Sequence, residues 1–223
     1  MKKLWKDDAG LFALAKQELF TAVVGDVMDK LGLRRQFLPA AIQPLREDMV
    51  TIGRAMPVLE ADCFEEGKKP FGYMLEALDD LKANEVYVCA GASHTYALWG
   101  ELMSIRAMKL GAVGAVMDGH SRDTHGILSL GFPVFSRGRY AQDQGPRGRV
   151  IDFRVPIEME GGVRIEPGDI IFGDLDGVCV IPKKAEREIF VKAVEKARGE
   201  KLVRKALEHG MGAAEAFQKF GIM

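Results

Sequence analysis

An alternation of short apolar runs with helical patterns in the middle of the chain restricts its fold more than any other feature. The apolar runs at residues 85–90, 112–117 and 133–136 are typical of buried strands. Helical patterns lie between them at residues 98–110 and 122–130, and each ends at a glycine. Connections of this length suit crossover helices, so we expect parallel strands covered by helices.

Further elements are expected before this β-α-β-α-β unit. The periodicity predicts three helices and one strand, at residues 11–19, 21–31 and 70–81 for the helices and 49–60 for the strand. Thr21 is placed to cap the second helix, and Gly32 is placed to end it.

After residue 136 the pattern changes to short apolar runs separated by Gly, Pro and Asp turns. These runs predict strands at residues 150–156, 162–165, 169–172 and 178–181. A long charged helix is expected at about residues 184–208, with a narrow apolar stripe of Ile189, Ala193, Ala197 and Leu202. That stripe suits packing on the surface or on a neighbouring subunit. We therefore predict one α/β domain over residues 1–223, with a central parallel β-α-β core and a mixed C-terminal β layer.

Composition excludes several classes of function. Lysine plus arginine total 31 against 32 acidic residues, and this near-neutral balance lacks the charge signature of a nucleic-acid-binding protein. No apolar run is long enough to cross a membrane, and charges interrupt the N-terminus, so we expect no signal peptide and a cytoplasmic location. Cys63, Cys89 and Cys179 form no C-x-x-C pair, and we expect unpaired cysteines.

Two loops of the β-α-β unit carry the candidate chemistry. If the strands are neighbours, the helices that follow them begin at the same edge of the sheet. Backbone amides at a helix start bind carboxylates, and Gly100 would allow a ligand to approach closely. Arg122 offers a planar fork for a carboxylate or 2-oxo group, and Asp123 is an oxygen ligand suited to Mg²⁺ or Mn²⁺. Glu101 is a candidate acid–base or water-positioning group.

The same residues allow plainer interpretations. Glu101 could simply complement a helix dipole, and Arg122 could pair with Asp118 or Asp123 at the surface.

Other polar residues near the two loops have open roles. His94, His120 and His125 lie around the expected crevice, but their spacing does not match a zinc site, and contact with substrate or exposure is the favoured interpretation. Asp174 and Asp176 are expected to shape a tight turn. Three arginines could bind a second carboxylate or be solvated: Arg139, Arg147 and Arg149.

One long segment resembles a known family. The chain reads W-G-E-L at residues 99–102, G-A-V-G-A-V-M-D-G at 111–119, R-D at 122–123 and L-G-F-P-V-F at 130–135. This ordered pattern resembles the RraA-like family, named after the regulator of RNase E activity A. That family includes 4-hydroxy-4-methyl-2-oxoglutarate/4-carboxy-4-hydroxy-2-oxoadipate aldolases. Weaker similarity extends over residues 21–32, 166–182 and the C-terminal helix.

The resemblance implies a layered α/β/β/α sandwich and a class II pyruvate aldolase. The family's acidic-x₂₀-Arg-Asp signature falls on Glu101, Arg122 and Asp123, although the first position of this signature is more often Asp. Asp123 would anchor Mg²⁺ or Mn²⁺, and Glu101 and Arg122 would be catalytic. The substrate-binding residues would be Gly100, Glu101, Leu102, Met103 and Arg122.

The resemblance also implies an assembly and a reaction. Members form homotrimers or homohexamers, and a carboxylate from a neighbouring subunit, here Glu200, could reach the site. The reaction would release pyruvate from a 2-oxo acid substrate, with oxaloacetate decarboxylation as a companion activity. The alternative is a non-enzymatic regulator that binds a ribonuclease, since fold alone does not fix function.

Overall fold

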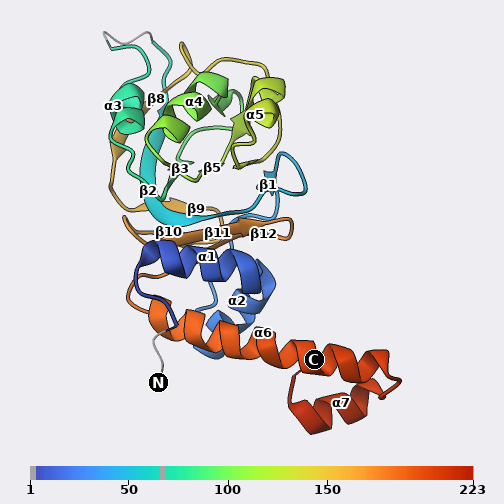
Figure 1. Cartoon of the computed structure of the whole chain (residues 1–223). Helices are drawn as coiled ribbons and strands as arrows, with labels where there is room; N and C mark the ends of the chain where they lie inside the picture. The colour runs from blue at the N-terminus through green and yellow to red at the C-terminus, as the bar shows by residue number, and fades with distance from the viewer. Residues whose placement is uncertain (1–3, 66–68, 223) are drawn as a thin grey trace.

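A curved eight-stranded sheet forms the centre of the molecule in the computed structural model, which describes residues 4–65 and 69–222. Figure 1 shows the sheet between two groups of helices. Its strands, in spatial order, are β1 (Gln43–Pro44), β7 (Val134–Ser136), β5 (Gly114–Met117), β3 (Glu85–Ala90), β2 (Thr51–Asp62), β11 (Ile170–Asp174) and β12 (Gly177–Ile181), and β8 (Gly148–Phe153) also pairs with β2.

The predicted parallel core is confirmed. β2 pairs in parallel with β3, β3 with β5, and β5 with β7. In the register of the two central strands, Val88 lies opposite Val116. β11 joins β2 in the antiparallel direction and β12 follows it, so the strands predicted at residues 169–172 and 178–181 continue the same sheet.

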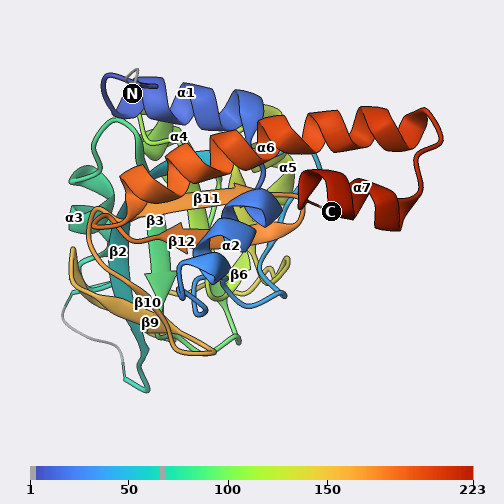
Figure 2. The ribbon, with the colours of Figure 1, turned by 90° about the horizontal axis from the view of Figure 1, so that it is seen from below.

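Helices cover the two sides of this sheet (Figure 1). One side carries α3 (Met74–Asp79), α4 (Glu101–Lys109) and α5 (Thr124–Leu130); the other carries α1 (Asp8–Glu18), α2 (Thr21–Lys30) and α6 (Glu186–Glu208). A last helix, α7 (Ala213–Phe220), folds back along the end of α6 that extends past the sheet (Figure 2). Across residues 4–65 and 69–222, no helix has the length and apolar character needed to cross a membrane.

Three apolar clusters fill the spaces between four layers. Strand β3 shows how: Tyr87 and Cys89 belong to the cluster under α3, α4 and α5, whereas Val86 and Val88 face the interior of the curved sheet. Side chains of a strand alternate between its faces, so one apolar strand serves both clusters. The interior also receives the hairpin of β9 (Ile157–Met159) and β10 (Val163–Ile165), and a third cluster lies under α1, α2 and α6. This arrangement matches the expected α/β/β/α sandwich.

Some local predictions are wrong. Residues 97–99 form a short strand, β4 (Ala97–Trp99), where the helix at residues 98–110 was expected to begin. Residues 120–121, between the expected strand and the expected helix, form β6 (His120–Ser121), because β4 and β6 pair with each other. The strand β9 and the helix α7 were not predicted.

The apolar stripe of the C-terminal helix is only partly as expected. Ile189, Ala193 and Ala197 are buried in the core, but Leu202 is 58% exposed and Val203 is buried instead. The end of α6 that extends past the sheet contacts α7 instead of the sheet (Figure 2).

Thr21 is the first residue of α2 rather than its cap. Its backbone N–H and its hydroxyl each donate to Asp174 at 2.7 Å, and Asp174 also accepts from the N–H of Asp176 at 3.0 Å. Asp174 therefore shapes the β11–β12 turn, as predicted, and also fixes the start of α2.

Replacing Thr21 with Val should lower the free energy of unfolding by about 1–2 kcal/mol, since a buried hydrogen bond to a carboxylate is lost. For a chain of this size we expect the melting temperature to fall by roughly 2–4 °C per kcal/mol. Thermal unfolding measures the effect, and Thr21→Ser, which keeps the hydroxyl, is the control. Equal stability of Thr21→Val and the wild type would contradict this role.

Candidate active site

The paired strands β4 and β6 bring the two predicted loops together. They run parallel, with Trp99 opposite Ser121, and lead into α4 and α5 respectively. The N–H of Arg122 donates to the carbonyl oxygen of Trp99 at 2.9 Å. The helix starts at Gly100 and Asp123 therefore lie side by side, as the sequence predicted.

Gly100 and Asp123 are in close contact. A Cβ atom on Gly100 would lie 2.6 Å from Oδ2 of Asp123, so glycine leaves room for this carboxylate in its present position. Asp123 has a left-handed backbone with φ of 55°, which Asp and Asn tolerate better than most residues. It occupies the N-cap position of α5, yet its side chain makes no capping hydrogen bond. The carboxylate is therefore available to a ligand.

Arg122 lies between two carboxylates. Its Nη1 is 3.0 Å from Oδ1 of Asp143, and its Nε is 3.7 Å from Oδ2 of Asp123. The expected alternative partner, Asp118, instead accepts from Nε of Arg137 at 2.6 Å. A guanidinium has five N–H donors, so Arg122 keeps donors for a ligand while Asp143 orients it.

Arg122 and Asp123 both line a cavity of about 240 Å³. This volume lies below the range of about 300–1,000 Å³ for drug-sized ligands and suits a small acid. The cavity is lined by Phe71, Met74, Leu75, Leu78, Ala97, Leu98, Trp99, Gly100, Leu102, Met103, Arg122, Asp123, Asp143 and Gln144. Asp143 and Gln144 were missed by the sequence analysis, because they lie in an irregular loop with no motif.

Gln144 is held by a buried carboxyl group. Its side-chain amide donates to Glu60, which is 2% exposed, and the Sγ of Cys89 lies 3.8 Å from the other oxygen of Glu60. Burial raises the pKa of Glu60 to about 8, with a smaller contribution from the charge of Asp62. Glu60 is thus largely neutral at pH 7, and it anchors the loop that carries Asp143.

This raised pKa predicts a pH-dependent stability. Below pH 4.5 both the folded and unfolded chains keep the Glu60 proton; as the pH rises to about 8 only the folded chain keeps it, so stability is lost over this window. Glu60→Gln removes this loss, and its melting temperature should exceed that of the wild type at pH 8 by more than at pH 5. Thermal unfolding at both values measures the difference, with the exposed Glu158→Gln as control. An equal difference at both values would contradict the buried neutral carboxyl.

Glu101 does not line the cavity. It lies in the first turn of α4, and its carboxyl group rests against Gly126 of α5, where a Cβ atom would lie only 2.2 Å from its Cδ. Gly126 therefore makes room for Glu101 between the two helices. Leu102 and Met103 do line the cavity.

Glu200 lies on α6, where it pairs with Lys196. Figure 1 places α6 on the opposite side of the sheet from α4 and from α5, which begins directly after Arg122 and Asp123. A contribution from Glu200 would have to come from a neighbouring subunit.

The histidines form no metal site. His94 Nε2 lies 3.4 Å from Oδ1 of Asp118, and the rings of His94 and His120 are 6.5 Å apart. Burial lowers the pKa of His120, with smaller contributions from the charges of His94 and Arg137, and its Nδ1 has no hydrogen-bond partner. In the part of the chain that the structure describes, no three His, Cys, Asp or Glu side chains are grouped to hold a metal ion.

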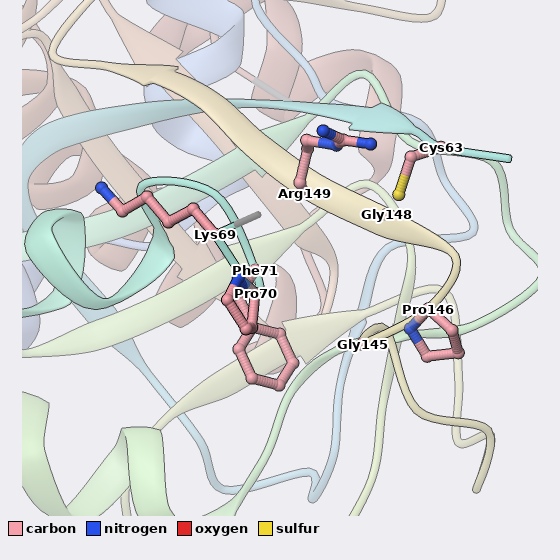
Figure 3. A pocket seen from close by; sticks show the side chains of 8 residues that line it. All are labelled: Cys63, Lys69, Pro70, Phe71, Gly145, Pro146, Gly148 and Arg149. Atoms are coloured by element: carbon pink, nitrogen blue, oxygen red, sulfur yellow. The ribbon is translucent and has the colours of Figure 1, made fainter. Parts of the chain in front are cut away.

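Two further cavities adjoin this region. One, of about 330 Å³, lies beyond Arg122 and Asp123 and includes Arg139, whose Nη2 donates to the carbonyl oxygen of Leu45 at 3.1 Å. The other, of about 320 Å³, shares Phe71 with the first cavity and includes Arg149 (Figure 3). Arg147 and Arg149 each donate to a backbone carbonyl oxygen, of Asp143 and Glu65 respectively.

The geometry defines an α/β protein with a small cavity at the carboxyl ends of parallel strands, where such proteins bind ligands. The family model described as "RraA-like: Aldolase/RraA" matches residues 21–180. The chain belongs to the RraA-like family.

Named relatives extend the comparison. The chain is 33% identical over 198 residues to a protein of Halalkalibacterium halodurans named "Putative 4-hydroxy-4-methyl-2-oxoglutarate aldolase", covering 88% of this chain and 89% of the relative. A crystal structure described as one of "novel cellulases from microbes associated with the gut ecosystem" shares 35% identity and a TM-score of 0.82, covering 90% of this chain and 89% of the other.

A third comparison shows the fold alone. Streptomyces coelicolor RraAS2, described as an unusual member of the RNase ES inhibitor RraA protein family, shares 23% identity and a TM-score of 0.78, covering 90% of this chain and 98% of the other.

Proposed function

We propose that this chain is a divalent-metal-dependent carbon–carbon lyase that releases pyruvate from small 2-oxo acids. One observation carries the proposal. Arg122 and Asp123, whose side chain makes no capping hydrogen bond, both line a cavity of about 240 Å³ at the start of α4. A cation beside a partly exposed carboxylate at a helix start suits an anionic substrate and a metal ion together. The similarity to named aldolases supports the same reaction class.

The substrate carboxylate binds at the first turn of α4. The backbone amides of Gly100, Glu101, Leu102 and Met103 supply unpaired N–H groups, and Gly100 lets the ligand approach. Arg122, oriented by Asp143, donates to the carboxylate or the 2-oxo oxygen.

Asp123 fits a magnesium or manganese ion. Its carboxylate is 46% exposed and faces the cavity, and Mg²⁺ often takes one or two protein carboxylates and fills its other positions with water and substrate. When bound, the metal acts as a Lewis acid on the 2-oxo group. The role of this chain is to hold the metal through Asp123 and the substrate through Arg122.

In a 4-hydroxy-2-oxo acid, such as 4-hydroxy-4-methyl-2-oxoglutarate, the bond between C3 and C4 breaks. The 4-hydroxyl loses its proton and becomes a carbonyl, and the bonding electrons pass to the pyruvate enolate, which a proton converts to pyruvate. Oxaloacetate gives the same enolate by losing CO₂. Glu101, whose carboxyl group would have to turn from Gly126 toward the cavity, is the proposed acid–base group on the chain itself, and Glu200 of a neighbour in a homotrimer or homohexamer is a second candidate.

Pyruvate release coupled to lactate dehydrogenase tests the proposal. Oxaloacetate and 4-hydroxy-4-methyl-2-oxoglutarate are assayed with Mg²⁺, with Mn²⁺ and with EDTA. We expect pyruvate from at least one substrate above the metal-only background and none with EDTA. No pyruvate from either, with folded protein and bound metal, would contradict it.

A protein-binding role is the second candidate, because one protein of the same fold is described as a member of an RNase ES inhibitor family. Such a role uses the outer surface and needs neither Arg122 nor Asp123. Two results together would favour the protein-binding role. The Asp123→Asn variant would still bind a ribonuclease, and the wild type would release no pyruvate.

A further inference from the structure

The wall of the candidate cavity beyond Arg122 is apolar. Phe71 and three residues from α3 form one part of it, and residues of β4 and α4 form the rest: Met74, Leu75, Leu78, Leu98, Leu102 and Met103. This wall and Gly100, at the start of α4, line the same cavity. A substituent that extends from the start of α4 into this cavity therefore packs against these side chains.

The charge of the cavity is unsuited to a second substrate carboxylate. Among the described residues that line it, Arg122 is the single cation, and it already contacts Asp123 and Asp143. The pyruvyl carboxylate would use the remaining donors of Arg122. A second carboxylate would then lack a cationic partner among the described residues that line the cavity, which costs free energy.

We infer that this site takes 4-hydroxy-2-oxo acids that carry an uncharged alkyl or aryl group at C4, in preference to 4-carboxylated substrates. The inference rests on the proposed function and names its substrate class. Cleavage then yields pyruvate and an apolar aldehyde or ketone, which the wall of Phe71, Leu75 and Leu78 holds.

The second cavity, beyond Asp123, is the competing place for a charged substituent. Arg139 lines it and donates one hydrogen bond to the carbonyl oxygen of Leu45, but it is not among the residues that line the cavity of Leu102 and Met103. A substrate held by the amides of α4 extends first along the apolar wall. Loss of diacid cleavage in Arg139→Gln would mark use of the second cavity.

Two substrates with the same scissile unit test the inference. 4-Hydroxy-2-oxohexanoate releases one pyruvate per cleavage and 4-hydroxy-4-methyl-2-oxoglutarate releases two, so one coupled assay, corrected for this difference, gives kcat/KM for both. We expect the apolar substrate to be favoured by at least about tenfold, since differences of a few buried atoms give discrimination of that order.

A lysine in the wall should reverse the preference. Leu75 is 55% exposed at the cavity edge, so Leu75→Lys adds a cation with little risk to folding, and Leu102→Lys, at 79% exposed, is a second variant. Each should shift the ratio of kcat/KM values at least about tenfold toward the diacid. Leu175→Lys, 53% exposed in the β11–β12 turn, is the matched control and should keep the wild-type ratio.

Exchange of the pyruvate methyl protons with D₂O distinguishes the proposed function from the inferred substrate preference. The exchange needs only formation of the pyruvate enolate and does not involve the group at C4 of the substrate. Exchange together with the apolar preference supports the inference. Exchange with equal or better use of the diacid, or lysine variants that keep the wild-type ratio, would overturn the inference and leave the proposed function standing. Absence of metal-dependent exchange would overturn both.

Discussion

Replacing Asp123 with Asn is expected to lower metal-dependent pyruvate release by on the order of a hundredfold or more. Loss of a partner in the outer shell of a metal site already costs about 10–100-fold, and Asp123 is proposed as the direct protein ligand. Asn keeps the shape of the side chain and tolerates the left-handed backbone at φ of 55°, so the change removes charge alone. Asp123→Ala would add backbone strain of about 1–3 kcal/mol and is a less specific variant.

The measurement is kcat/KM as a function of Mg²⁺ and Mn²⁺ concentration, with thermal unfolding to show that the fold is kept. Asp176→Asn, an exposed residue in the β11–β12 turn, is the matched control and should behave as the wild type. Wild-type kcat/KM and metal dependence in Asp123→Asn would show that the metal binds elsewhere.

Replacing Arg122 with Gln is expected to raise KM for the 2-oxo acid and lower kcat/KM by about 10–100-fold. Hydrogen bonds to a charged group contribute about 1.5–3 kcal/mol, and each 1.36 kcal/mol is a tenfold change in rate. Arg122→Lys keeps the charge but loses the fork that contacts Asp143 and is proposed to contact the substrate, so an intermediate loss is expected.

Steady-state kinetics with a single substrate separates the two parameters. A loss confined to KM means that Arg122 binds the ground state and the transition state equally, whereas an additional fall in kcat means that it also stabilises the transition state. Arg139→Gln, in the neighbouring cavity, is the control and should retain wild-type cleavage of the apolar substrate. An unchanged KM in Arg122→Gln would remove Arg122 from the substrate site.

Elements with a strong burial pattern were predictable from the sequence. All six residues of β3 are buried, and its predicted bounds, residues 85–90, match the structure. The strand β4 and the helix α7 could not be predicted, because β4 has three residues and exists only through its pairing with β6, and α7 depends on packing against α6. Such elements are set by tertiary contacts rather than by local periodicity.

The candidate site was predictable only where residues follow strand ends. The adjacency of Gly100 and Arg122–Asp123 follows from parallel strands and was correctly expected. Asp143, which orients Arg122, lies in an irregular loop. That loop is anchored by the hydrogen bond from Gln144 to Glu60, two residues that are 84 positions apart in the chain. No local pattern connects residues so distant in the chain.

The direction of the Glu101 side chain also could not be predicted from the sequence. A helix start indicates where its Cα lies, but packing against Gly126 decides where the carboxyl group points. This placement matters for the proposed proton transfer, since the group must come within hydrogen-bond reach of the substrate.

The most direct test of the central claim is ¹H NMR of pyruvate in D₂O with the purified protein, with Mg²⁺ or Mn²⁺ and with EDTA. If the chain forms the pyruvate enolate with a metal at Asp123, the methyl signal will decay as deuterium replaces protium, and EDTA will stop the decay. The Asp123→Asn variant will show no decay above the metal-only background, even with Mg²⁺ or Mn²⁺ present. A methyl signal that persists at the rate of the metal-only background, with folded and metal-loaded wild-type protein, would contradict the account.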